Sequence, residues 1–193
     1  MTATLTKDTQ PILVEGLTWQ EFKVIEQLLD RPGVRLSFLS GVLEIRKMPG
    51  KQHETVKKRI AALVEEYLQF LGLDFTPTGS MTLESEEGLV KREADESYEL
   101  GTDRERLDLV IEVVISSGGI NKLEAYKRLK ISEVWFWEKG NFFLYTLRCN
   151  GYEEISHSEV LPGLNIALLT SYVNMPNHSQ ALREFRRELQ LPA

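Results

Sequence analysis

Residues 107–126 read LDLVIEVVISSGGINKLEAY, and the fold is organised around this stretch. Most residues from 107 to 114 are Val, Ile or Leu, which is the composition of a strand buried on both faces. Residues 116–119 are Ser and Gly, and they end the strand. Lys122 follows near the start of an amphipathic helix that carries Tyr126 on its apolar face. The stretch therefore predicts a central strand followed by a helix.

Two acids, Asp108 and Glu112, interrupt this apolar strand. Side chains alternate along a strand, so residues four apart point to the same side. Burying two like charges costs several kcal/mol unless a lysine or a divalent cation compensates them. With Lys122 on the next helix, the pattern suggests a metal-dependent phosphodiesterase site. The sequence leaves a second interpretation open, in which Asp108 sits at the strand's exposed end and Glu112 pairs with an arginine.

Length and composition indicate one folded domain. A chain of 193 residues, 42% hydrophobic and 27% charged, is ordinary for a globular protein and predicts a single domain over 1–193. Within it, residues 1–16 are expected to form an N-terminal arm and residues 179–193 a C-terminal helix. The one cysteine, Cys149, excludes an internal disulfide and a cysteine-rich zinc site.

Charge and hydropathy narrow the class of partner. The net charge of −6 argues against indiscriminate nucleic-acid binding, which depends on neutralising phosphates, but it does not exclude a nuclease. The chain begins without a basic segment followed by an apolar core, and no apolar run approaches about 20 residues. We therefore expect a cytoplasmic protein that does not enter a membrane.

The first half of the chain predicts a helix, a hairpin and a long helix. Thr18 to Glu21 form a capping-box pattern, and Ser40-Gly41 is a turn signal between the strands 34–39 and 42–47. Residues 52–71 read as a helix closed by Gly72, with a basic run at 57–59 that favours a solvated face over a phosphate contact.

Two polar residues in this half are possible accessories to a site. Glu44 alternates with apolar neighbours, so it faces either solvent, which the pattern favours, or the site. His53 lies in the first turn of the long helix, where a lone histidine is usually structural.

The middle of the chain supplies a third acid. Residues 74–83 read as a strand, and Pro77 places it at the edge of a sheet. An acidic loop over 84–91 precedes the polar run 92–100. If that run pairs beside the 107–114 strand, Asp95 can reach the same place as the two acids of that strand.

The last part of the chain predicts an antiparallel meander of three strands, at 133–138, 142–147 and 152–156. The turns between them are expected at Lys139-Gly140-Asn141 and Cys149-Asn150-Gly151. Its aromatic residues could form an exposed platform on which bases stack, although packing in a core or a dimer interface is the stronger expectation.

These parts favour one kind of chemistry. Asp95, Asp108 and Glu112 could hold Mg²⁺ or Mn²⁺ with oxygen ligands, and Lys122 could orient or deprotonate a water molecule and stabilise developing charge. The sequence lacks GxxxxGK[ST], GxGxxG, HExxH and GxSxG motifs, so other chemistries have little support.

The order of these features resembles the Uma-two family of endonucleases, within the restriction-endonuclease-like superfamily whose core motif is written PD-(D/E)xK. The resemblance runs from about Thr18 to Leu169. It rests on the 107–114 strand, the serine-glycine break, Lys122 and the EVWFW run at 133–137. It implies an α/β (α+β) fold with a central mixed β-sheet flanked by helices.

The resemblance also implies roles for single residues. Asp95 matches the first acid of the motif, and Asp108 and Glu112 match the paired acids of the central strand. Val114 stands where the superfamily motif has lysine, and Lys122 on the following helix is similar to a migrated substitute. His53 and Glu44 match family positions near the site entrance.

Three functional hypotheses follow. The first is a Mg²⁺- or Mn²⁺-dependent DNA endonuclease that acts as a homodimer. The second is an inactive relative that binds nucleic acid or protein as a dimer. The third is a purely structural dimer module. Convergence of the three carboxylates within one cation's ligand shell would favour the first.

Overall fold

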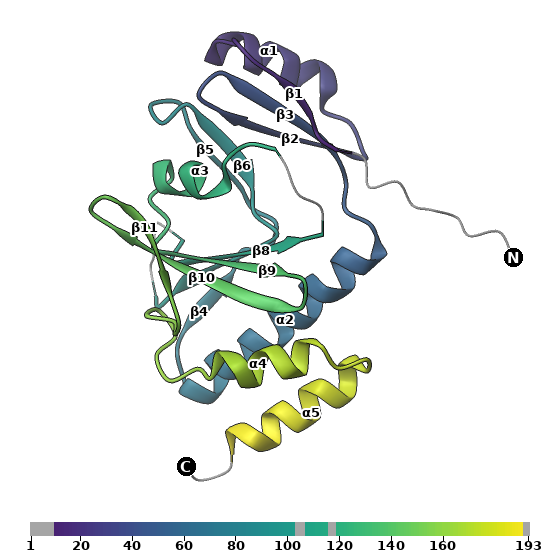
Figure 1. Ribbon diagram of the computed structural model, residues 1–193, viewed down its shortest axis with the longest axis vertical. Coiled ribbons are helices and arrows are strands. Elements are labelled where there is room, and N and C mark those ends of the chain that lie inside the picture. The colour runs from purple at the N-terminus through teal and green to yellow at the C-terminus, as the bar shows by residue number, and fades with distance from the viewer. Residues whose placement is uncertain (1–9, 103–106, 116–118, 191–193) are drawn as a thin grey trace, which may run out of the picture.

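The computed structural model describes residues 10–102, 107–115 and 119–190. These residues form five helices and two β-sheets, one of six strands and one of five (Figure 1). The predicted α+β class and the central mixed sheet with flanking helices are confirmed. The sequence did not indicate the second sheet.

The central strand β8, Leu109–Val114, lies inside the six-stranded sheet, whose order is β11-β10-β9-β8-β7-β4. It pairs in parallel with β9 and antiparallel with β7, so the sheet is mixed. The other strands of the sheet are β4 (Phe75–Pro77), β7 (Glu96–Leu100), β9 (Glu133–Glu138), β10 (Asn141–Arg148) and β11 (Gly151–Ile155). The predicted meander β9-β10-β11 is confirmed, and Pro77 does lie on an edge strand.

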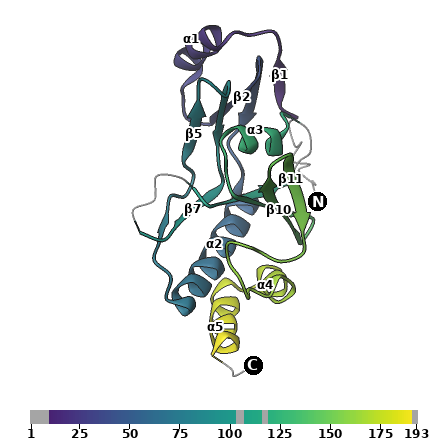
Figure 2. The ribbon, with the colours of Figure 1, turned by 90° about the vertical axis from the view of Figure 1, so that its left-hand side faces the viewer.

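Helices cover both faces of β8. Leu109, Ile111 and Val113 pack in the core cluster of helix α2, Lys51–Leu71, which ends at Gly72 in the left-handed region. Helices α4 (Ile166–Val173) and α5 (His178–Leu189) lie against α2 (Figure 2). On the opposite face, Val110 packs with residues of helix α3, Lys122–Arg128. The strand is therefore buried on both faces, as its composition predicts.

The five-stranded sheet is antiparallel and has the order β1-β3-β2-β6-β5. Its strands are β1 (Ile12–Val14), β2 (Val34–Leu39), β3 (Val42–Lys47), β5 (Thr82–Ser85) and β6 (Val90–Glu93). Helix α1, Trp19–Leu29, begins with the predicted capping box, and its Phe22 stacks on Phe38 with ring centroids 4.6 Å apart. The hairpin of β2 and β3 has the predicted bounds.

Two predicted segments are wrong in detail, because the chain changes sheets there. The strand expected over 74–83 is two strands, β4 and β5, which belong to different sheets. The strand expected within 92–100 is likewise divided, since β6 ends at Glu93 in one sheet and β7 begins at Glu96 in the other. The loop expected over 84–91 includes the end of β5 and the start of β6. Asp95 therefore lies at the crossing between the two sheets.

The aromatic strand belongs to the core. Trp135 is fully buried, and Trp137 is 5% exposed. The Trp135 indole Nε1 donates a hydrogen bond to Glu133 at 2.6 Å, and both indoles pack edge-on against Phe142. An exposed stacking platform on these tryptophans is therefore ruled out, and the expectation of core packing is confirmed.

The two ends of the chain agree with their predictions only in part. Of the expected N-terminal arm, residues 12–14 form the edge strand β1, while residues 1–9 lie outside the described part. The expected C-terminal helix begins at His178 and ends at Leu189, and residues 191–193 are likewise not described. Among the described helices, none has the length and apolar character to cross a membrane.

Candidate active site

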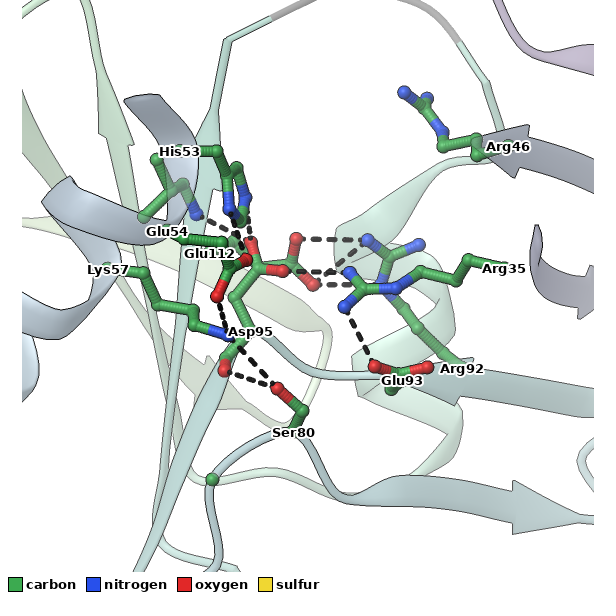
Figure 3. A network of polar contacts seen from close by, with 12 residues as sticks. Arg35, Arg46, His53, Glu54, Lys57, Ser80, Arg92, Glu93, Asp95 and Glu112 are labelled. Atoms are coloured by element: carbon green, nitrogen blue, oxygen red, sulfur yellow. Dashed lines mark hydrogen bonds and ion pairs between the residues drawn. The ribbon is translucent and has the colours of Figure 1, made fainter. Parts of the chain in front are cut away.

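A cavity of about 490 Å³ lies where the two sheets meet, and five of the six predicted site residues line it. Figure 3 shows His53, Asp95 and Glu112 among them, in a network of polar contacts. These five come from both sheets, from two helices and from the crossing between the sheets. They are Glu44 on β3, His53 on α2, Asp95 between β6 and β7, Glu112 on β8 and Lys122 at the start of α3. The sixth predicted residue, Asp108, does not line the cavity.

Glu112 is surrounded by hydrogen-bond donors. Its carboxylate is 1% exposed and accepts bonds from Arg92 Nε at 3.0 Å and Arg92 Nη2 at 2.9 Å. Lys122 Nζ donates to Oε2 at 2.7 Å, and the Tyr126 hydroxyl donates to Oε1. Burial alone would raise the pKa of Glu112, but the charges of Arg92 and Lys122 hold it below its ordinary value. The carboxylate is therefore ionised at neutral pH.

Asp95 lies beside Glu112 in the wall of the cavity and is held in a similar way. Its Oδ1 accepts a bond from Arg35 Nη1 at 2.8 Å, and its Oδ2 accepts from the Val113 backbone N–H at 2.9 Å. His53 Nε2 lies 3.0 Å from Oδ2. Burial opposes ionisation, but His53 and Arg35 outweigh it, so the pKa of Asp95 falls well below its usual range. Burial lowers the pKa of His53, but the hydrogen bond to Asp95 raises it by more. The pKa of His53 therefore lies above its ordinary value.

The pair of Asp95 and His53 predicts a pH-dependent contribution to stability. The folded-state pKa of Asp95 lies below its ordinary 3.8, so its contribution is present above about pH 4 and is lost as the pH falls. The folded-state pKa of His53 lies above its ordinary 6.5, so its contribution is lost as the pH rises through that higher value. We expect His53→Gln to lower the free energy of unfolding by about 1–2 kcal/mol between pH 4 and 6.5, and by less at pH 8.5. Urea denaturation across this pH range measures the difference.

The exposed residue His157 provides the control for this series. His157→Gln changes a side chain on the surface and should alter the free energy of unfolding by less than about 0.5 kcal/mol. A His53→Gln penalty that is constant from pH 4 to 8.5 would contradict an ionic role for the pair.

Glu44 faces the cavity, so the expectation that it faces solvent is wrong. It is 2% exposed, and its carboxylate accepts hydrogen bonds from within β3 and from the backbone just before α3. Arg46 Nε donates to its Oε1 at 2.8 Å, and the Ile120 backbone N–H donates to its Oε2 at 2.9 Å. A Cβ on Gly119 would collide with Glu44 Oε2, so glycine permits this close approach. Glu44 thereby fixes the segment that leads into Lys122.

Asp108 lies away from the other acids. It precedes β8, and four residues at about 3.3 Å each separate it from Glu112 by about 13 Å. Its Oδ2 accepts a bond from the Leu100 backbone N–H at 2.9 Å. Asp95 and Glu112 therefore line one cavity, but the three acids do not meet there as expected. The second interpretation is closer to the structure, since Glu112 pairs with an arginine and Asp108 precedes the strand, although Asp108 is only 7% exposed.

The sequence reasoning missed Arg35, Arg92 and the polar role of Tyr126. Arg92 is buried on the same side of β6 as Val90, but this pattern gives no sign that the chain crosses to the other sheet after Glu93. Tyr126 lies one helical turn after Lys122, and this i, i+4 spacing places both on one helix face. That spacing is a signal in the sequence from which the shared contact with Glu112 could have been predicted.

Comparisons with known proteins identify the fold and the family. A solved structure, described as a putative nuclease belonging to DUF820 from Anabaena variabilis ATCC 29413, superposes with a TM-score of 0.57 at 14% identity. The match covers 82% of this chain and 99% of that one, and it shows a shared fold. No curated protein matches the chain. The model of the Uma2 family, described as "Putative restriction endonuclease", matches residues 19–173. This match spans most of the chain, which therefore belongs to the Uma2 family.

Proposed function

We propose that the protein is a metal-dependent endonuclease that hydrolyses DNA phosphodiester bonds. The observation that carries the proposal is the convergence of Asp95, Glu112 and Lys122 on one cavity from three separate elements. Membership in a restriction-endonuclease family makes nucleic acid the expected substrate class. The fold by itself would not fix this function.

The donor set fits a hard divalent cation. Mg²⁺ keeps several waters and is commonly bound through one or two carboxylates together with substrate phosphates. Asp95 and Glu112 offer such a pair of carboxylates on one wall of the cavity. Among the described residues, no three His, Cys, Asp or Glu side chains are grouped to hold a metal. The described residues therefore fit Mg²⁺ or Mn²⁺ bound with water ligands better than a metal enclosed by protein ligands alone.

Each residue has a proposed role. Asp95 and Glu112 would hold the cation, which supplies a polarised phosphoryl oxygen and a water that is nucleophilic at neutral pH. Lys122 donates to Glu112 and brings a positive charge to the place where a phosphate would enter. His53 and Glu44 are positioning residues, because one holds Asp95 and the other holds the segment that precedes Lys122.

The test is nicking of supercoiled plasmid DNA by the wild-type protein in Mg²⁺, in Mn²⁺ and in excess chelator. We expect nicking with either metal and none in chelator. Nicking that is unaffected by chelator would contradict the metal-dependent mechanism.

One observation favours the alternative, an inactive relative that binds nucleic acid or protein. Every carboxylate oxygen of Asp95 and Glu112 already accepts at least one hydrogen bond from a charged side chain. A cation would have to share these oxygens with Arg35, His53, Arg92 and Lys122. Binding of DNA without cleavage in any metal would establish this alternative.

A homodimer and a cytoplasmic location are further parts of the proposal. The tryptophans that suggested a dimer face are buried within the protomer, so they no longer support it. Light scattering at several protein concentrations tests the dimer directly, since an obligate dimer keeps twice the protomer mass on dilution.

A further inference from the structure

The cavity is electropositive although the whole chain is acidic. Six cationic side chains line it, against three acidic ones, whereas the chain carries a net charge of −6. The six are Arg35, Arg46, Lys47, Lys51, Arg92 and Lys122. A cleft with one sign of charge concentrates counter-ions of the opposite sign. Basic residues therefore outnumber acidic residues where an anionic chain would approach.

Two of these cations, Lys47 and Lys51, have side chains without a partner among the described residues. Both are exposed and both line the cavity. Most other described lysines form ion pairs: Lys23, Lys57, Lys58, Lys91, Lys122 and Lys139. Lys127 donates to the Asn150 carbonyl, which leaves Lys130 as the third lysine with an unpartnered side chain in the described part of the chain. Two of these three lysines thus stand at one cavity.

The segment that joins these lysines also favours anions. Lys47 ends β3 and Lys51 begins α2, and the N-cap between them is Gly50, which has no side chain to cap the helix. The first-turn N–H groups of a helix attract negative charge. Deeper in the same cavity, Arg92 is 4% exposed, and its Nη1 has no hydrogen-bond partner among the described residues. Arg92 therefore adds a positive charge to the lining of this cavity, with one donor still unpartnered in the described part of the chain.

The other basic run of the sequence does not offer a comparable surface. Lys57 pairs with Glu54, Lys58 pairs with Glu96, and Arg59 donates to backbone carbonyls near the end of α4. All three side chains therefore already have partners within the protein.

We propose that Lys47 and Lys51 form a docking strip for the phosphodiester backbone of DNA, beside the phosphate that enters the cavity. This inference rests on the proposed function, because it takes the cavity to receive the scissile phosphate. The two ammonium groups contact phosphates that flank the reacting one, so they set the position of the strand and not its sequence.

The experiment measures binding of a labelled 20-base-pair DNA duplex by fluorescence anisotropy, in chelator and between 50 and 200 mM salt. The double variant Lys47→Gln/Lys51→Gln should weaken binding about tenfold at 100 mM salt. It should also reduce the slope of log K against log salt by about 1.8, since each phosphate contact contributes about 0.9. The matched control Lys127→Gln/Lys130→Gln removes the same charge from exposed positions outside the cavity and should change neither quantity.

An unchanged slope in the double variant, or an equal loss in the control, would overturn the docking strip. So would a wild-type protein that does not bind the duplex. Because the binding is measured without metal, the result is separate from that of plasmid nicking. A reduced slope in a protein that never nicks DNA would support the strip and reject the nuclease.

Discussion

Glu112→Gln should abolish measurable metal-dependent cleavage, with a fall in rate of about 10³-fold or more. The change keeps the size of the side chain and removes its charge, which is the property that a divalent cation requires of its ligand. A catalytic metal ion stabilises the transition state by several kcal/mol. Losing about 4 kcal/mol of this stabilisation lowers the rate by about 10³-fold. The measurement is the initial rate of plasmid nicking in Mg²⁺ and in Mn²⁺, with far-UV circular dichroism to verify that the variant is folded.

Asp108→Asn is the matched control, because it makes the same chemical change at an acid that does not line the cavity. The amide introduced by this change would retain a side-chain oxygen to accept the bond from the Leu100 N–H. The nicking rate of this variant should stay within a few fold of the wild type. Equal losses in the two variants would contradict the site described above and restore the paired-acid assignment. Full activity in Glu112→Gln would point to a contaminating nuclease.

The contrast between Asp108 and Glu112 shows where sequence reasoning about the site reaches its limit. The composition of β8 correctly predicts that the strand is buried on both faces. Alternation says nothing of position along the strand relative to other elements. Asp95 reaches Glu112 because β7 is paired with β8 in a register that sets Glu96 opposite Ile111. That register depends on how two separate strands pair, so it cannot be derived from the sequence of either strand alone.

The same limit explains the missed arginines. Local signals such as the capping box at Thr18, the turn at Gly41 and the cap at Gly72 were read correctly, because each is contained in a few consecutive residues. The second sheet depends on a crossing at Ala94-Asp95 inside a polar run, where no glycine or proline marks a break between strands. Arg35 and Arg92 reach the acids only across that junction. Their contacts could therefore not be derived from the residues around them.

Arg92→Met should destabilise the protein by about 3–5 kcal/mol at pH 7. The pair of Arg92 and Glu112 is buried on both sides, and removing one partner leaves the other as a poorly compensated buried charge. Lys122 and Tyr126 would still contact Glu112, but the folded-state pKa of Glu112 should rise toward and above its ordinary value. The penalty should therefore shrink as the pH falls and Glu112 takes up a proton. Urea denaturation at pH 7 and at pH 5 measures both quantities.

The double variant Arg92→Met/Glu112→Gln separates loss of a charge pair from loss of packing. Replacing both members of a buried pair is often nearly neutral, so the double variant should be more stable than Arg92→Met alone. A double-mutant cycle with the two single variants gives the coupling energy, which we expect to exceed about 2 kcal/mol for groups in direct contact. Additive effects would mean that Arg92 stabilises the junction of the two sheets through packing. In that case Lys122 would have to maintain the ionised state of Glu112. The charge of the active site would then depend on helix α3, which begins at Lys122.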